Sequence, residues 1–254
     1  MKEEIISFIS QVFAKTGKKK AVIGVSGGID SAVVLALVTN SLSKDSVIPV
    51  LMPFAKQEMQ DAVKICTWNG FTPDLVIEKN IEPIVEAASL VLGGNQDQVR
   101  QGNLMARARM MVLFDTAKKH DALVAGTENK SENILGYFTR FGDSASDLEP
   151  IAHLYKTQVR QLAIELGLPS RFLEKQPSAG LWQGQSDEQE FGFSYQDADQ
   201  LLMKMENEAS KLGCSFKNAI EKHLEQNQMS ETERKILQRV KQNWFKQEVP
   251  YKIN

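Results

Sequence analysis

The stretch from Lys20 to Leu37 (KAVIGVSGGIDSAVVLAL) constrains the fold more than any other part of this sequence. It opens with an apolar, β-branched run at 21–25, which is typical of a buried parallel strand. A Ser-Gly-Gly turn at 26–28 ends the run, and the apolar segment that follows predicts a helix. A strand, a glycine turn and a helix N-terminus in this order form an anion site. Glycine lets backbone N–H groups approach a phosphate, and the helix dipole attracts its charge.

Side chains around this turn indicate that the anion is a phosphate bound together with a metal ion. Ser26 and Ser31 offer hydroxyl donors, whereas Asp30 would repel a bare phosphate and therefore indicates an intervening metal ion. Mg²⁺ usually takes one or two carboxylates together with substrate phosphates. Glu132, just beyond a predicted strand end, is the candidate second carboxylate. Taken alone, a carboxylate at that position is more often a surface residue in the first turn of a helix.

Two other interpretations of the turn are open. Residues 24–28 also fit G-x-S-x-G, the nucleophile elbow of α/β hydrolases, with His120, His153 and His223 as candidate bases. An elbow on the first strand is badly placed for that fold, however, and does not require the following Asp-Ser pair. The other interpretation is a tight turn without a ligand. The sequence contains no Walker A motif and no G-x-G-x-x-G opening a helix, which excludes those two nucleotide sites.

Strands and helices alternate along the first half of the chain. Strands are predicted at 21–25, 46–54, 74–77 and 122–125, and helices at 1–15, 30–37, 59–69, 81–92 and 102–120. This alternation predicts an α/β protein with a doubly wound, mostly parallel, Rossmann-like sheet and C-terminal helices. Ligands bind beyond the carboxyl ends of such strands. We therefore expect the turn at 26–28 and Gly126-Thr127 to converge on one site.

The 254 residues suffice for one large domain. We expect an N-terminal helix at 1–17, an α/β core at 20–175, and a flexible loop followed by charged helices at 176–254. Apolar residues do not recur at helical or strand spacing over 136–147, and proline and glycine residues interrupt the segment 176–189. Both segments are predicted to be loops over the site.

Composition limits the partners and the location. A formal net charge of −2 gives no reason to expect nucleic acid or an acidic membrane. Cys66 and Cys214 lie far apart, so neither a disulfide framework nor a zinc site is indicated. No signal peptide is evident, and the longest apolar run is too short to span a bilayer. A cytoplasmic location is predicted. The basic run at 18–20 is interpreted as a solvated connector, with a contribution to a phosphate site as the alternative.

Further motifs extend the pattern. The residues SGGIDS resemble the SGGxDS pyrophosphate loop of the N-type ATP pyrophosphatases, which cleave ATP between its α and β phosphates. Four more segments follow in order: GNLMARARM, GTENKSENILGYFTRFGD, LYKTQVRQLA and QPSAGLWQGQSDEQEFGFSY. Together the five resemble NAD synthetase, in particular its short, ammonia-dependent form, from about residue 21 to residue 250. Several motifs in the correct order are far more specific than any one of them.

The resemblance implies a ligase of adenine nucleotide α-hydrolase-like fold. This ligase makes NAD from deamido-NAD, ATP and ammonia, and releases AMP and diphosphate by way of an acyl adenylate. It implies a homodimer and Mg²⁺ as the metal. The implied ATP contacts are Gly24, Val25, Ser26, Gly27, Gly28, Ile29, Asp30, Ser31, Thr127, Lys156 and Ser178.

The resemblance also assigns individual roles. Asp30, Lys156 and Thr127 would act in catalysis, and Asp30 and Glu132 would bind magnesium. The implied contacts to deamido-NAD are Arg107, Arg140, Asp147, Phe245 and Lys246. Arg107 and Arg109 cannot share one helix face, so only one of them is expected to serve the ligand.

The sequence departs from the family at the substrate side. Many relatives have Gly-Gly where this chain has residues 144–146 (SAS), so a different backbone path is expected there. Arg140 stands where lysine is more usual, which keeps the charge and changes the donor geometry. Phe245 stands where longer members have histidine, so the role of that histidine is absent or met by stacking.

Competing functions remain at this point. One is another pyrophosphatase-loop enzyme, such as a tRNA-modifying or GMP-forming amidase. A basic face or a cysteine pair would be expected of the tRNA-modifying and thiolating enzymes, and neither is evident. A second is a catalytically silent nucleotide-binding protein. About twenty residues before the first strand cannot hold a glutaminase domain, so free ammonia is the expected nitrogen donor, with delivery by a separate partner as the open alternative.

Overall fold

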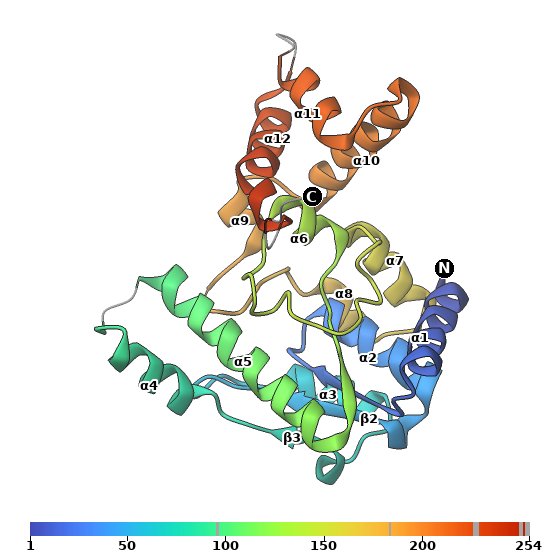
Figure 1. Ribbon diagram of the computed structural model, residues 1–254, viewed down its shortest axis with the longest axis vertical. Coiled ribbons are helices and arrows are strands. Elements are labelled where there is room, and N and C mark those ends of the chain that lie inside the picture. Colours follow the sequence, from blue (N-terminus) through green and yellow to red (C-terminus); the bar gives the residue numbers. More distant parts are fainter. Residues whose placement is uncertain (95–96, 183, 226–228, 249–250, 252–254) are drawn as a thin grey trace.

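The computed structural model describes residues 1–94, 97–182, 184–225, 229–248 and 251. Its α/β part is built on a parallel sheet, on the side of the molecule away from the C-terminal helices (Figure 1). The strand order is β3-β2-β1-β4. The strands are β1 (Lys20–Gly24), β2 (Val47–Leu51), β3 (Ile77–Glu78) and β4 (Ala122–Ala125). The chain winds outward from β1 to β3 and then returns to the other side of β1 with β4. This reversal of direction confirms the doubly wound sheet.

Helices surround the sheet and continue beyond it. In chain order they are α1 (Lys2–Thr16), α2 (Ile29–Leu42), α3 (Gln60–Trp68), α4 (Glu82–Val91), α5 (Gln98–His120), α6 (Lys130–Leu135), α7 (Lys156–Glu165), α8 (Ser170–Glu174), α9 (Asp187–Phe191), α10 (Tyr195–Leu212), α11 (Phe216–Leu224) and α12 (Glu231–Asn243). Among the described residues, no helix is long and apolar enough to cross a membrane.

Strand β1 is central because its side chains serve two cores. Ala21 and Ile23 belong to the apolar cluster that includes α1, α2 and α7, whereas Val22 belongs to the cluster that includes α4 and α5. All three side chains are fully buried. Burial on both faces explains why the run is continuously apolar instead of alternating with polar residues.

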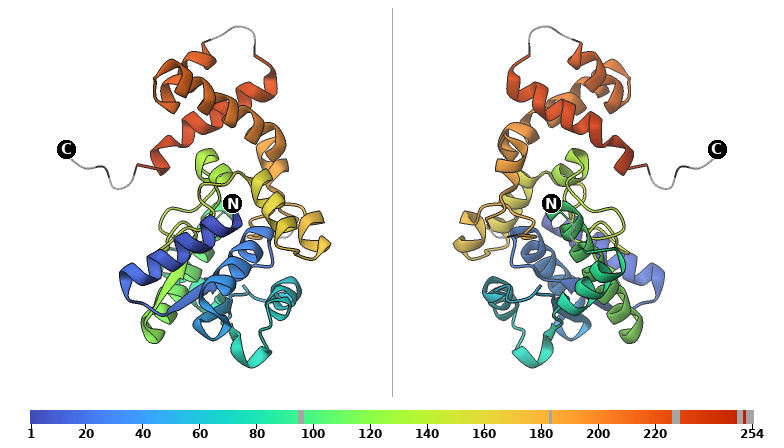
Figure 2. Two further views of the ribbon diagram at one scale, coloured as in Figure 1. Left: turned by 90° about the vertical axis from the view of Figure 1, so that its right-hand side faces the viewer. Right: turned by 90° about the vertical axis from the view of Figure 1, so that its left-hand side faces the viewer.

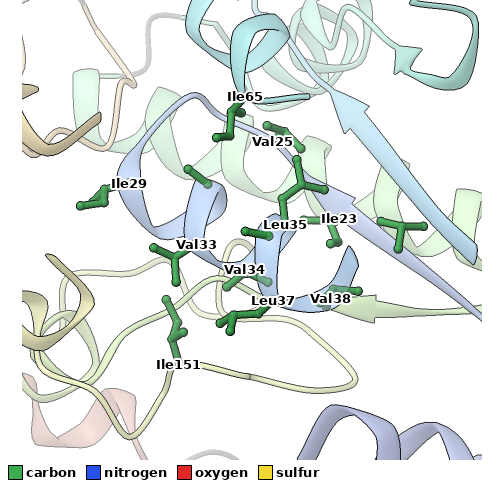
Figure 3. Close-up of a cluster of buried hydrophobic side chains, with 14 of the residues drawn as sticks. Ile23, Val25, Ile29, Val33, Val34, Leu35, Leu37, Val38, Ile65 and Ile151 are labelled. Carbon is green, nitrogen blue, oxygen red and sulfur yellow. The ribbon is translucent and has the colours of Figure 1, made fainter. Parts of the chain in front are cut away.

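Helix α2 is apolar all round. Its residues 32–38 are fully buried, because the helix contacts α1, α7, β1 and β2 (Figure 3). Val33, Leu37 and Ile151 lie together in the close-up, on the side of α2 that faces the segment before α7. A helix enclosed in this way holds the turn at its N-terminus firmly against the end of β1.

The C-terminal helices form a core of their own. Helices α10, α11 and α12 project from the sheet layers (Figure 2) and pack with α6 around Leu202, Met205 and Leu237. Helix α10 also contacts α7. The helical part therefore touches the α/β core through the two helices that follow β4.

Three predicted elements differ in the structure. The strand expected at 74–77 is a 3₁₀ turn, Pro73–Leu75, followed by the two-residue edge strand β3. Pro73 begins that turn, and Leu75 N and Val76 N donate within it to Thr72 O and Pro73 O, so these two N–H groups are not available to a strand ladder. Helix α5 begins before Gly102, with the Asp97 side chain capping Arg100 N. The short helix α6 falls within a motif segment that the sequence left unassigned.

Two expectations involve residues that the structure does not describe. Residue 183 lies within the predicted loop at 176–189, and residues 249–250 lie at the end of the region of resemblance. Both lie outside the described part of the chain.

Candidate active site

The site lies where the sheet changes direction. Strands β1 and β4 are hydrogen-bonded neighbours, and the turn after β1 and the Gly126-Thr127 segment after β4 border one pocket of about 380 Å³. The expected convergence is confirmed. Of the residues predicted to bind ATP or magnesium, those that line this pocket are Gly24, Val25, Ser26, Gly28, Ile29, Asp30, Ser31, Thr127, Glu132, Lys156 and Ser178.

Gly27 lies beneath the pocket and shapes the turn. Its φ is +78°, and an added Cβ would lie 2.8 Å from Ala62 N and from Asp61 Cβ. Both the torsion and the close approach require glycine. Gly27 therefore brings the turn against α3 without forming part of the pocket lining.

Two serine hydroxyls brace the turn from within. Ser31 Oγ donates to Gly28 O at 3.1 Å and accepts from Ser26 N at 3.3 Å, and Gly28 N donates to Ser26 Oγ at 3.2 Å. Because Gly28 is the N-cap residue of α2, it has no side chain to cap the helix. The first-turn N–H groups of a buried 14-residue helix therefore face the pocket as an anion site.

Beside this turn, one lysine joins two carboxylates. Lys156 Nζ lies 2.6 Å from Asp30 Oδ2 and 2.9 Å from Glu132 Oε1. The three side chains come from the first turns of α7, α2 and α6. Helix starts favour carboxylates and leave their backbone N–H groups free. With both carboxylates ionised, the cluster has a net charge of −1.

Asn129 connects the two carboxylates. Its Nδ2 donates to Asp30 Oδ1 at 3.0 Å, while its Oδ1 accepts from Glu132 N at 3.0 Å and caps α6. The Glu132 side chain returns to Asn129 N, which completes a capping box. The spacing N-x-x-E at 129–132 was a sequence signal for this helix start and for the orientation of Glu132.

Burial and mutual charge shift the ionisation of the cluster. Burial alone would lower the pKa of Lys156, but Asp30 and Glu132 outweigh it and hold that pKa above its ordinary value. Burial raises the pKa of Glu132, and the nearby charge of Asp30 adds to this rise against the opposing effect of Lys156. Lys156 therefore stays charged, while the carboxylates gain from further positive charge.

A buried network anchors the start of α7. Ser131 Oγ donates to Asp199 Oδ1 at 2.5 Å and accepts from Lys156 N at 2.8 Å. Asp199 Oδ2 accepts from Thr157 N at 2.8 Å. Asp199 is fully buried on α10, so the C-terminal helices hold the backbone of Lys156. Sequence reasoning missed this residue, because nothing in the spacing of α10 distinguishes it.

The loop at 176–189 reaches the same cluster. Asp187 accepts from Ala179 N at 3.0 Å and from the Tyr195 hydroxyl at 3.1 Å. Lys156 Nζ lies 5.2 Å from the centre of the Tyr195 ring. This buried aspartate was also missed. It joins the start of α9 to Ala179 earlier in the loop, and both residues line the pocket.

The predicted substrate residues divide into two groups. Arg140 lies 5.1 Å over the ring of Phe245, and Lys246 Nζ donates to Gly136 O at 2.6 Å and Phe138 O at 3.0 Å. Phe245 therefore stacks on a cation, one of the two outcomes expected at this position. Phe245 and Lys246 lie in the turn that follows α12 and contact the loop after α6, outside the pocket lining.

Arg107 contacts that group through the Arg140 carbonyl, and Asp147 lies beside β4. Arg107 is exposed and donates to Arg140 O at 3.4 Å, whereas Arg109 on the same helix lines the pocket and donates to Met52 O at 3.1 Å. The Asp147 carboxylate accepts from Val124 N at 2.7 Å and extends the edge of β4. Contact of either residue with a substrate stays a prediction.

The loop at 144–146 avoids the torsions that glycine would permit. These residues lie in the described part of the chain, and none has a positive φ there; Phe141 adopts one instead, at +58°. Ser146 Oγ donates to Glu149 Oε1 at 2.7 Å, and Ser144 Oγ donates to Thr139 O at 3.1 Å. Serine hydroxyls therefore tie the loop to its own neighbours.

The hydrolase interpretation lacks its base. His120, His153 and His223 all lie in the described part of the chain, and none of them lines the pocket. His223 lies on α11, 3.8 Å from Glu208. The site therefore has the features of a nucleotide-binding α/β protein, with a glycine turn and a helix N-terminus beside the point where the sheet changes direction.

Known proteins agree with this class. A family model described as NAD synthase matches residues 1–250. An NH(3)-dependent NAD(+) synthetase of Thermococcus kodakarensis is 41% identical over 204 residues, which cover 80% of this chain and 79% of that protein. The protein of that name from Fusobacterium nucleatum is 37% identical over 249 residues, which cover 97% and 92%.

Solved structures agree as well. An NMN synthetase from Francisella tularensis has a TM-score of 0.81 at 30% identity and covers 100% of this chain and 97% of its own. An NH3-dependent NAD synthetase from Campylobacter jejuni, in complex with nitrate, has a TM-score of 0.78 at 30% identity with the same coverage. The chain belongs to the NAD synthase family and is thus a nucleotide-binding ligase of NAD biosynthesis.

Proposed function

We propose that this protein converts deamido-NAD, ATP and ammonia to NAD, AMP and diphosphate through an acyl adenylate. The observation that carries the proposal is the Lys156 cluster beside the pyrophosphate turn. Lys156 is bound between Asp30 and Glu132, at 2.6 and 2.9 Å, next to a helix N-terminus open to an anion. Such an arrangement suits a substrate that carries several phosphates and loses two of them together.

The chemistry needs no protein nucleophile. The substrate carboxylate attacks the α-phosphorus in line and forms the acyl adenylate, and diphosphate departs. Ammonia then adds to the acyl carbon, AMP leaves, and the amide is released after loss of a proton. The turn at 24–31 binds the phosphates, Thr127 and Ser178 contact the nucleotide from the other loops, and Lys156 balances charge on the departing diphosphate. Positioning and preorganised charge provide the acceleration.

We also propose that Asp30 and Glu132 hold Mg²⁺. Carboxylate oxygens are the ligands that this ion prefers, and it commonly shares one or two of them with substrate phosphates. The net negative charge of the Lys156 cluster fits a divalent cation. When bound, the ion supplies charge neutralisation to the phosphates.

The pyridine side of the substrate is assigned to the loop after α6. Arg140, Phe245 and Lys246 offer cations and a stacking surface there. Arg107, which donates to Arg140 O, and Asp147, beside β4, are proposed as further substrate contacts. The loops at 136–147 and 176–189 are proposed to exclude water from the adenylate. Protection of these loops from protease by ATP with deamido-NAD would support this role, and unchanged cutting would contradict it.

Further features of the proposal follow the family resemblance. The chain acts as one NAD synthetase domain, functions as a homodimer in the cytoplasm, and takes free ammonia as its nitrogen donor. Neither a nucleic acid nor a membrane is a partner. A size measurement in solution at micromolar concentration tests the dimer directly.

One structural neighbour raises a second substrate. The Francisella tularensis protein is an NMN synthetase and matches over the whole chain. That name implies the same amidation on a mononucleotide. The two substrates share a pyridine carboxylate, so the proposed activation chemistry serves either one.

The deciding experiment incubates the purified protein with ATP, Mg²⁺ and ammonium, together with deamido-NAD or nicotinate mononucleotide. NAD and AMP in equal amounts, absent with the Asp30→Ala variant, would support the proposal. Faster product formation from the mononucleotide would favour the second substrate. AMP without an amidated pyridine would contradict both.

A further inference from the structure

A second lysine reaches the pyrophosphate turn from the opposite side. Lys175 ends α8 and precedes Ser178 by three positions. Its Nζ donates to Gly27 O at 3.1 Å, and the residue lines the pocket. An ammonium group thus lies directly against the backbone of the turn that is built to hold phosphate.

Lys175, Arg171 and their shared partner Asp61 together carry an excess of positive charge. Its Nζ also donates to Asp61 Oδ2 at 2.9 Å, while Arg171 binds the other oxygen of the same carboxylate. One aspartate therefore serves two cations, and the trio has a net charge of +1. If Lys175 turns toward a ligand, Asp61 keeps Arg171 as its partner, so no carboxylate is left unpaired.

The other cations that line the described pocket are less available. Lys156 is buried between two carboxylates. Arg109 donates to Met52 O and to Gln57 Oε1, at 3.1 and 3.0 Å, on the far wall. Lys175, in contrast, is 45% exposed, and its side chain is a flexible point charge. ATP stays negatively charged with one Mg²⁺ bound, and Lys156 already balances two carboxylates, so a further cation at the turn favours phosphate binding.

We propose that Lys175 is a second cationic ligand of the β and γ phosphates of ATP and of the diphosphate product, and that it exchanges Asp61 for phosphate when the nucleotide binds. The inference rests on the proposed function for the identity of the nucleotide. Gly27 connects phosphate binding at the turn with the movement of Lys175, because Gly27 shapes the turn and its carbonyl accepts the hydrogen bond from Lys175. The lysine thereby joins α8 and the following loop to the phosphates.

The alternative is a purely structural tether between α8 and α3. Arg171 provides a matched control for it. Both cations bind Asp61 and are similarly exposed, at 44% and 45%, but only Lys175 lines the pocket. A tether would be weakened by loss of either cation, whereas a phosphate ligand would be lost only with Lys175.

The test compares Lys175→Met, Arg171→Met and Asp61→Asn in the full chain. Calorimetric titrations give the Kd for ATP and for diphosphate with Mg²⁺ present, and thermal unfolding reports stability. We expect Lys175→Met to weaken both ligands about tenfold or more, because a charge-assisted hydrogen bond is lost. Arg171→Met and Asp61→Asn should change both Kd values less than about twofold, since the Lys175 ammonium remains. The KM for deamido-NAD should be unchanged in all three variants.

Two outcomes would overturn the inference. Equal weakening by Lys175→Met and Asp61→Asn would identify a tether, and unchanged affinity in Lys175→Met would remove the phosphate role. Because binding is measured without turnover, failure of the proposed reaction is separable: a wild-type protein that binds ATP and makes no NAD leaves the comparison of variants intact. A wild-type protein that binds neither ATP nor diphosphate would overturn both.

Discussion

Lys156 Nζ lies 2.6 Å from Asp30 Oδ2, although the two residues are 126 positions apart in the sequence. Asp30 comes from the helix after the first strand, and Lys156 comes from a helix after the last. The parallel sheet brings the two helix starts together because both lie beyond the carboxyl ends of adjacent strands. The contact between Asp30 and Lys156 therefore joins the turn after β1 and the later sequence motifs in a single site.

Removing the Lys156 charge is predicted to lower activity strongly and to weaken the fold. In Lys156→Met, Asp30 and Glu132 would face each other without a cation. We expect kcat to fall ~10²–10³-fold, as for other losses of charge stabilisation. We also expect the free energy of unfolding to fall by about 3 kcal/mol at pH 8. Rates of AMP formation and urea unfolding check this. Lys130→Met, which removes the partly exposed partner of Glu206, is the control and should retain activity.

The two glycines of the turn are predicted to differ in tolerance. Gly27→Ala would put a Cβ 2.8 Å from backbone and side-chain atoms of α3 at a φ of +78°, so the turn must shift. We expect ~1–2 kcal/mol of destabilisation from the torsion alone, and loss of ATP binding. Gly28→Ala has a φ of −88° and its nearest contact at 3.4 Å. It should cost less than about 1 kcal/mol. Similar unfolding midpoints for the two variants would contradict this prediction.

Glu128 is predicted to make stability fall as pH rises. Burial, followed by the charge of Glu149, raises its pKa to about 9 from an ordinary value of 4.5, and its Oε1 has no hydrogen-bond partner in the described structure. The folded state thus retains a proton that the unfolded state releases. Its contribution to stability is complete below pH 4.5 and is lost as pH approaches 9.

The Glu128→Gln variant tests whether stability falls with rising pH because of this residue, since a glutamine side chain has no carboxyl proton to lose. Its free energy of unfolding should increasingly exceed that of the wild type between pH 5 and pH 9. Glu86→Gln, at an exposed position on α4, should show no such trend. A difference between Glu128→Gln and wild type that stays constant across this range would refute the assignment.

Asp199 is predicted to affect catalysis without contacting substrate. Asp199→Ala would leave Ser131 Oγ and Thr157 N without their buried acceptor, at a cost of ~1–3 kcal/mol per group. Because Lys156 N is held by Ser131, we expect kcat to fall more than the KM for either substrate rises. Asp199→Asn keeps one acceptor oxygen and should recover part of the rate. Gln200→Ala, at an exposed neighbouring position, is the control.

Local sequence signals were sufficient for the pyrophosphate turn. The apolar run of β1, the glycines and the helix start all depend on neighbours within a few positions, and the structure has each of them where expected. Helix α6 was missed, although Asn129 and Glu132 carry its capping signal. The strand predicted near residue 75 was wrong, because the turn at Pro73–Leu75 takes up N–H groups there and the chain forms the short edge strand β3 only after it.

The sequence by itself predicted the doubly wound sheet and the glycine turn between β1 and α2, because periodicity, glycine torsions and helix-start signals act over short distances along the chain. Most of the candidate site residues came instead from the resemblance to NAD synthetase. Tertiary structure alone decided which charges meet. The partners of Lys156, the anchor at Asp199 and the approach of Lys175 to Gly27 each join residues more than 20 positions apart. Such pairs strengthen only when folding brings them together and removes water from around them.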